Sequence, residues 1–414
     1  MKLQIFRSLS GDCVLLTSPG GKRILADGGM PDAYTDHIAT PLGALRKADI
    51  ELDVLYVSHI DRDHIGGVLR MLDIETEWRV FDHMTDKGKT WSKPKSVRPP
   101  IARKIWHNAF FDTIQQTKAV NLGTAGLSQI LNSAATTLSA ANNTAGAAYA
   151  RLLALSVGDA IAVNWRIGDG QLGIPLNPEY DGGFMVRGGD QISIGDLTIT
   201  VISPSAKELR ELKKTWIDWL QNNQKELSRL RRQQKRDIDR LDSSSADQVV
   251  DLARTLALRV EPDVTPPNLA SLVLLVECDG RRILLSGDAG DLTILEALEE
   301  AGLMDDDGGI DLDVLKVPHH GAHNSFSEDF VRRVRAKHYI FCGDGEHDNP
   351  EHDVVDGYIA APGSFKLWFN CSSDVALPKH LKHWRTLEKM AADAPSRVKS
   401  RFLRSGASLT LNLA

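Results

Sequence analysis

The stretch 58–67 reads Ser-His-Ile-Asp-Arg-Asp-His-Ile-Gly-Gly and places two imidazoles and two carboxylates within six positions. It follows an apolar run that predicts a buried strand, and it precedes a segment whose pattern predicts a helix. Residues two apart in an extended loop point the same way, so His59 and Asp61 can bind one cation. Asp63 and His64 then turn toward a second position. A divalent cation relieves the repulsion and desolvation of so many titratable groups, which favours a metal-binding loop over a solvated surface loop.

Two later stretches repeat this plan of a strand followed by a ligand-rich loop. Ser286-Gly287-Asp288 places a carboxylate at the end of one predicted strand, and three histidines, His319, His320 and His323, follow another. Loops at the carboxyl ends of strands converge readily on one edge of an α/β core. We therefore expect the three stretches to form one site.

Length and composition narrow the class of protein. The chain has 414 residues, of which 42% are hydrophobic and 25% charged, as in a soluble globular protein. Its longest apolar runs are far shorter than the roughly 20 residues that cross a bilayer, and its N-terminus lacks a secretory pattern. We expect a cytoplasmic protein without a membrane segment. Its four cysteines have no metal-type spacing and predict reduced, mostly buried thiols: Cys13, Cys278, Cys342 and Cys371.

Charge is distributed unevenly along the chain. The net charge is −6, yet the runs 87–104, 207–240 and 379–404 carry +7, +5 and +6. This asymmetry suits a polyanionic substrate that approaches an acidic, cation-holding centre, although solvated helix faces would give the same runs. Lysines and a tryptophan are interleaved in the first run, a pattern typical of nucleic-acid binding: Lys87, Lys89, Trp91 and Lys93.

Taken together, the motifs resemble those of the metallo-β-lactamase-fold hydrolases. The resemblance rests on Asp27-Gly28-Gly29 after a strand, the motif at 59–64, Ser286-Gly287-Asp288 and Val317-Pro318-His319-His320-Gly321. It is strongest to the ComEC-type branch of DNA-uptake proteins and their free-standing relatives, whose Asn-x-x-Ser is matched by Asn268 to Ser271. The resemblance implies an α/β fold, a four-layer αβ/βα sandwich with a metal centre at one edge.

The resemblance also implies roles for individual residues. His59 and Asp61 would hold a first divalent ion, Asp63, His64 and His319 a second, and Asp288 would bridge the two. The ions would be zinc or manganese. His320 would be a ligand in place of His319 or a group that faces the substrate, so the catalytic set is Asp63, His64 and His320. Asp27 would be a buried structural carboxylate. The family's usual third-motif histidine is absent, and the residues assigned to the substrate are Asn268, Ser271, His323, Lys87, Lys89 and Lys93.

The resemblance also divides the chain into core and insertions. The core would comprise 1–81, 181–206 and 266–350, interrupted by a basic, alanine-rich helical insertion at 82–180 and a charged helical insertion at 207–265, and followed by a C-terminal helix and strand at 351–414. Both insertions would border the metal cleft. The small-residue stretch 139–146 is typical of an exposed connector and favours a cap that a regulatory protein partner moves or cuts.

These inferences predict a metal-dependent phosphodiesterase, a nuclease that acts on DNA. Two alternatives stay open. One is a metallohydrolase that acts on a nucleotide, ester or lactone, since a metal pair serves all these reactions. The other is a partner-binding effector with little activity of its own.

Overall fold

The computed structural model describes residues 1–108, 159–160, 162–209 and 271–413. Most of both predicted insertions, including the stretch 139–146, lies outside the described residues, and so does Asn268 of the predicted core. No helix in the described parts combines the length and apolar character needed to cross a bilayer.

One of the two sheets has six strands in the order β14-β1-β2-β3-β4-β5. Its strands are β1 (Lys2–Phe6), β2 (Val14–Thr17), β3 (Arg23–Ala26), β4 (Val54–Val57), β5 (Ile105–His107) and β14 (Ser408–Asn412). The last three strands of this order, β3, β4 and β5, run parallel, so their carboxyl ends meet at one edge.

The other sheet has eight strands in the order β13-β12-β11-β10-β9-β8-β7-β6. Its strands are β6 (Ile192–Ile194), β7 (Leu197–Ser203), β8 (Val273–Cys278), β9 (Arg281–Leu285), β10 (Ile310–Lys316), β11 (Val334–Phe341), β12 (Phe365–Phe369) and β13 (Val398–Phe402). Strands β9 to β13 are parallel and also end together.

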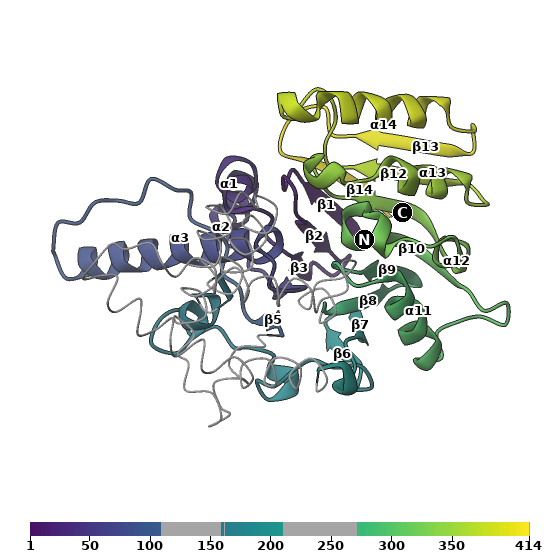
Figure 1. Ribbon diagram of the computed structural model, residues 1–414. Helices are drawn as coiled ribbons and strands as arrows, with labels where there is room; N and C mark the ends of the chain where they lie inside the picture. Colours follow the sequence, from purple (N-terminus) through teal and green to yellow (C-terminus); the bar gives the residue numbers. More distant parts are fainter. Residues whose placement is uncertain (109–158, 161, 210–270, 414) are drawn as a thin grey trace, which may run out of the picture.

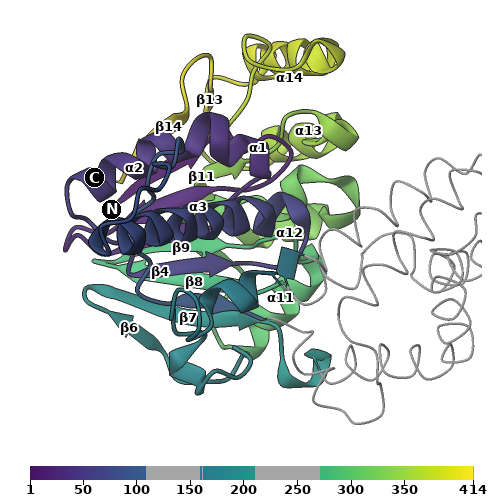
Figure 2. The same cartoon turned by 90° about the vertical axis from the view of Figure 1, so that its left-hand side faces the viewer.

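Helices cover the outer face of each sheet, so the molecule has four layers (Figures 1 and 2). The helices α1 (Pro31–Ala33), α2 (Ala39–Lys47) and α3 (Arg62–Asp86) pack on the six-stranded sheet. The eight-stranded sheet carries α11 (Asp291–Glu300), α12 (Glu328–Arg333), α13 (His352–Ala360) and α14 (Leu381–Asp393). The predicted α/β sandwich is confirmed.

The alternation of side chains along the strands explains this layering. In β4, Val54 and Tyr56 point into the core between the sheets, whereas Leu55 and Val57 point into the core beneath the helices. Both faces of the strand are therefore buried, which is why the sequence shows a continuous apolar run there in place of alternation.

The structure departs from the predicted boundaries at three places. Residues 351–414, predicted as a C-terminal helix and strand after the core, contain two helices, α13 and α14, and supply β12 and β13 to the eight-stranded sheet and β14 to the six-stranded sheet. Helix α3 continues to Asp86, and β5 lies inside the range 82–180 that was assigned to an insertion. The last helix of the chain, α14, begins at Leu381 and ends at Asp393. Ala394 is extended before Pro395, because proline disfavours helical backbone in the preceding residue, and β13 follows. The division into core and insertions otherwise stays a prediction.

Candidate metal centre

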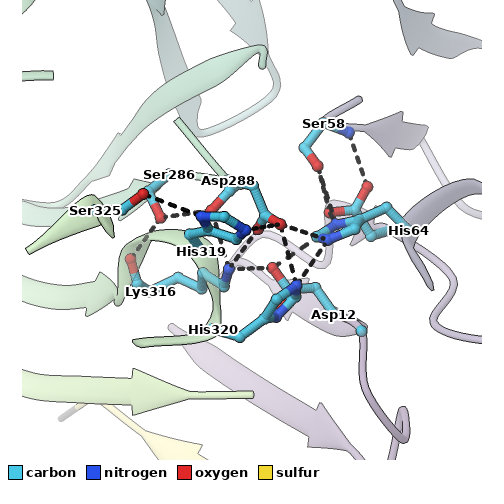
Figure 3. Close-up of polar contacts among 12 residues, drawn as sticks. Asp12, Ser58, His64, Ser286, Asp288, Lys316, His319, His320 and Ser325 are labelled. Atoms are coloured by element: carbon cyan, nitrogen blue, oxygen red, sulfur yellow. Dashed lines mark hydrogen bonds and ion pairs between the residues drawn. The ribbon is translucent and has the colours of Figure 1, made fainter. Parts of the chain in front are cut away.

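Loops from both sheets meet where the parallel strands end. Asp27 follows β3, His59 to His64 follow β4, Asp288 follows β9, and His319 and His320 follow β10 (Figure 3). The loop between β1 and β2 adds Asp12. Residues from distant parts of the chain thus share one edge of the sandwich.

Four imidazoles surround one carboxylate oxygen at this edge. The distances from Asp288 Oδ2 to the Nε2 atoms are 3.8 Å for His59, 3.3 Å for His64, 3.8 Å for His319 and 3.1 Å for His320. The side chain of Asp288 is 4% exposed. A buried carboxylate that faces several imidazole nitrogens is a ligand arrangement for divalent metal.

The other ring nitrogen of each imidazole has its own partner. Asp27 Oδ2 lies 3.0 Å from His64 Nδ1, and Asp12 Oδ1 lies 3.1 Å from His320 Nδ1. The hydroxyls of Ser58 and Ser325 lie 3.1 Å from the Nδ1 atoms of His59 and His319. Such partners fix the ring orientation and leave Nε2 as the ligand atom. All four Nε2 atoms are therefore turned toward Asp288.

Glycines allow the loop after β4 to lie against the loop after β3. A Cβ on Gly28 would lie 2.3 Å from the Val68 nitrogen, and one on Gly67 would lie 1.9 Å from the Gly28 carbonyl oxygen. Only glycine fits at both positions, and the first turn of α3 therefore sits directly on the turn after β3. This contact brings His64 over Asp27, which also accepts hydrogen bonds from the backbone nitrogen of Ser58 at 2.7 Å and from its hydroxyl at 2.8 Å.

The tightest group of ligand atoms differs in part from the predicted set. One ligand atom from each of Asp12, His64, Asp288 and His320 lies within 4.8 Å of the others, and all four residues are buried. His320 is thus closer to Asp288 than His319 is. Positive φ angles of 46° at His319 and 55° at His320 turn the chain tightly, which brings both imidazoles into the site.

Asp61 and Asp63 occupy the open side of the site. Asp63 Oδ2 lies 3.4 Å from His320 Nε2, and Asp61 Oδ2 lies 3.6 Å from His59 Nε2. Their side chains are 26% and 29% exposed. Asp61 is the N-cap residue of α3 but makes no side-chain capping bond, so its carboxylate faces the site without that competition.

The site also contains a buried lysine that the sequence analysis did not assign. Lys316, the last residue of β10, forms an ion pair with Asp12, lies 3.5 Å from Asp288 Oδ1 and donates a hydrogen bond of 3.0 Å to the Gly287 carbonyl. Burial alone would lower the pKa of Lys316, but the carboxylates of Asp12 and Asp288 outweigh it and raise the pKa. Lys316 could have been found from the sequence, because a charged residue at the end of an apolar strand is unusual. Asp12 could not, because its sequence context is that of an ordinary aspartate in a turn.

The residues predicted to contact substrate lie in different places. Ser271 is buried beside the site, since the next residue, Leu272, donates a 2.8 Å hydrogen bond to the Ser58 carbonyl. His323 is 66% exposed and pairs with Asp353 at 2.6 Å. Lys87, Lys89 and Lys93 follow the end of α3 and are exposed. Helix α3 begins at the site and has 25 residues, so Lys87, the residue after its end, lies roughly 36 Å from its start along the axis. The chain then turns back, and Lys93 lies over the Trp78 ring of the same helix.

The donor set fits divalent metal. His59 Nε2 is buried and, among the described residues, has no hydrogen-bond partner, as expected for a ligand atom that awaits a cation. Imidazole nitrogens with carboxylate oxygens suit zinc or manganese. His64, Asp288 and His320, which belong to the tightest group of ligand atoms, would hold the metal most directly, and His59 Nε2 lies 3.8 Å from Asp288 Oδ2.

Protons occupy the site when metal does not. Burial alone would lower the pKa values of His64 and His320, but Asp288, together with Asp27 and Asp12, raises both well above the ordinary range. A divalent cation must displace these protons, because it binds the neutral imidazole. Binding near neutral pH is therefore expected to release protons, and the affinity should rise with pH until the raised pKa values are passed. Calorimetric titration of the metal-free protein in buffers of different ionisation enthalpy measures this release; a release of zero would contradict the expectation.

Two comparisons with known proteins agree with this geometry. The chain is 33% identical over 105 residues to ComE operon protein 3 of Bacillus subtilis (strain 168). The similarity covers 25% of this chain and 13% of that protein, so the chain spans a small part of its relative's length. Residues 7–75 match the model of the metallo-beta-lactamase superfamily. These residues include the loop that carries His59 and His64. The fold and the candidate metal site are consistent with that superfamily, which suggests a metal-dependent hydrolase.

Proposed function

We propose that this protein is a metal-dependent phosphodiesterase that hydrolyses DNA. The observation that carries the proposal is the convergence of four imidazole Nε2 atoms on the buried Asp288 carboxylate, 3.1 to 3.8 Å away. The choice of DNA rests on the resemblance to the ComEC-type branch and on the run of lysines that follows α3.

The residues of the site would have separate roles in hydrolysis. A bound divalent cation lowers the pKa of water and stabilises charge on phosphoryl oxygens. Asp12 and Asp27 hold the imidazoles of His320 and His64 in one orientation. Asp63 lies on the open side, where its side chain is 26% exposed and its Oδ2 lies 3.4 Å from His320 Nε2, so it is placed to accept a proton there. Lys316 keeps a positive charge beside Asp288 throughout.

The test is hydrolysis by the purified full-length protein after treatment with chelator. Supercoiled plasmid and a single-stranded oligonucleotide are incubated with added Mn²⁺ or Zn²⁺, beside a simple phosphodiester, a lactone and a chelator control. Asp63→Ala and His64→Ala should abolish cleavage, whereas His83→Ala, an exposed histidine on α3, should not. Turnover of the small substrates alone would favour the small-molecule hydrolase, and metal binding without any turnover would favour the partner-binding effector.

The lysines that follow α3 provide a separate test of whether the substrate is a polyanion such as DNA. In the described part of the chain, no ion pair joins Lys87, Lys89 or Lys93 to a carboxylate, and Lys93 Nζ lies 5.5 Å from the centroid of the Trp78 ring. A duplex of about 11 base pairs spans the roughly 36 Å from Lys87 back to the metal centre, and Lys93 lies along that path. Neutralising all three lysines with alanine is expected to lower the salt-dependence slope of binding to a 20-base-pair duplex by about 2 to 3.

The matched control removes three exposed lysines that do have carboxylate partners, Lys337, Lys379 and Lys389. This control should change the slope less. Turnover of the simple phosphodiester should be unaffected in both variants, because neither touches the metal centre. An unchanged slope in the first variant would show that the run at 87–93 is only a solvated surface.

A further inference from the structure

A basic surface on the eight-stranded sheet has no part in the site described so far. Its cations are Lys366 on β12 and Lys399 and Arg401 on β13. Lys399 and Arg401 are exposed, and Lys366 is half-buried. In the part of the chain that the structure describes, no ion pair joins any of the three to a carboxylate. Their positive charges are therefore available to a partner.

The alternation of side chains along β13 separates an apolar face from a basic face. Val398 and Phe402 pack into the core under α14, and the Phe402 ring lies 6.5 Å from the Trp384 ring of that helix. Successive side chains of a strand point to opposite faces, so Lys399 and Arg401 point away from α14. Figure 1 shows β13 beneath α14 at one end of the sandwich. The basic face of β13 is exposed at that end.

The register of the strands gathers the three cations around one tryptophan. Lys366 pairs with Lys399, and Trp368 pairs with Arg401. Lys366 Nζ lies 5.3 Å from the centroid of the Trp368 ring, and Arg401 Cζ lies 6.0 Å from it. Trp368 is 4% exposed, and its Nε1 donates a 3.1 Å hydrogen bond to His338 Nδ1, which holds the ring in one orientation. A cation over an indole ring is attracted to it, so Trp368 positions two of the three charges.

Protection of a sheet edge does not account for all three cations. Strand β13 is the last strand of its sheet, and charged side chains on an edge strand keep it from pairing with another chain. Lys366, however, lies on β12, which pairs with β11 on one side and β13 on the other. A charge on a strand that is paired on both sides protects no edge. The basic surface therefore calls for another role.

The strand register also sets the distance between this surface and the candidate metal centre. One row across the parallel strands contains, in order, Lys316, Ile340, Trp368 and Arg401. Neighbouring strands are about 4.8 Å apart, so the backbone of Arg401 lies about 14 Å from that of Lys316. Lys316 Nζ in turn lies 3.5 Å from Asp288 Oδ1. The distance of about 14 Å corresponds to about four base steps of DNA.

We propose that Lys366, Lys399 and Arg401 bind backbone phosphates of the DNA that reaches the metal centre. Their backbone positions are about 5 to 7 Å apart, which suits a partner of high charge density, and each DNA strand carries one negative charge per about 3.4 Å. Trp368 is buried, so it offers no aromatic anchor of the kind that protein interfaces use. The inference rests on the proposed function and adds a second DNA contact to the lysines that follow α3.

The experiment measures how a duplex of about 20 base pairs binds to the full-length protein in chelator over a range of salt concentrations. The variant Lys399→Gln with Arg401→Gln removes both charges of β13. The matched control, Lys382→Gln with Arg385→Gln, removes two exposed charges of α14, which covers the opposite face of β13. We expect the slope of log affinity against log salt to become shallower by about 2 in the variant and by less than about 1 in the control. Addition of Lys366→Gln should reduce the slope by about 1 more.

A charge-preserving variant, Lys399→Arg with Arg401→Lys, should keep the slope, because a phosphate contact depends on charge. Should the double glutamine variant fail to fold, Arg401→Gln alone decides, with an expected reduction of about 1. The proposal is overturned if the slope of the variant matches that of the starting protein or that of the control. It is also overturned if the variant loses binding to polyglutamate but not to DNA, which would indicate an acidic protein partner. Failure of the proposed function has a different signature, since the starting protein would then bind DNA in chelator and cleave none after metal is added.

Discussion

Replacement of Asp288 by asparagine is expected to lower hydrolysis by at least about 10³-fold and to lower the amount of metal bound per chain. The substitution keeps the size of the side chain but removes the negative charge on which four Nε2 atoms converge. A loss of this size equals about 4 kcal/mol of transition-state stabilisation, in the range ascribed to one metal or one preorganised charge. Turnover and bound metal per chain, measured on the same preparation, check both parts of the expectation.

A matched control separates the site from the general effect of removing a buried carboxylate. Asp313 lies in β10, its side chain is 7% exposed, and it pairs with Arg281 and Lys337 but with no imidazole. Asp313→Asn should lower stability modestly and leave bound metal and turnover unchanged. The metal-free Asp288→Asn protein should melt below the starting protein, because His64, His320 and Lys316 lose a buried negative partner, so metal content and turnover are compared at a temperature where both proteins are folded. Metal content and turnover that survive in Asp288→Asn would place the reacting centre elsewhere.

The parts of the fold and site that could be predicted from sequence are those whose residues lie close together in the chain. The loop at 58–67 contains its own strand end, ligands and glycines, so its position between β4 and α3 followed from local pattern. Asp288, His319 and His320 each come directly after a strand, and parallel strands end at one edge, so their meeting could be expected.

Residues whose meaning depends on a distant partner could not be found in this way. Asp12 gains its role only through His320, 308 positions away, and through Lys316. The length of α3 could not be predicted for a different reason, because a uniform helical pattern does not show where the helix ends. The position of that end decides how far Lys87 lies from the metal centre.

Replacement of Lys316 by methionine is expected to destabilise the metal-free protein by about 3 to 5 kcal/mol, the usual result of breaking one partner of a buried ion pair. The side chains of Lys316 and Asp12 are 4% and 5% exposed, so water cannot solvate the carboxylate that is left behind. Burial alone would raise the pKa of Asp12, and Lys316, with His320, at present lowers it. Chemical unfolding in the presence of chelator measures the loss.

The double variant Lys316→Met with Asp12→Asn decides whether the uncompensated charge is the cause. Removing both members leaves no isolated charge from the pair, so more than half of the lost stability should return, and the two substitutions should be strongly non-additive. Lys337→Met is the exposed control, because the side chain of Lys337 is 63% exposed in its pair with Asp313. This substitution should lower the free energy of unfolding by less than about 1 kcal/mol. Additive losses in the double variant would mean that Lys316 stabilises the fold through its packing. A divalent cation should also reduce the loss of stability in Lys316→Met, since it restores positive charge beside Asp288. In the starting protein that charge is the ammonium of Lys316, 3.5 Å from Asp288 Oδ1.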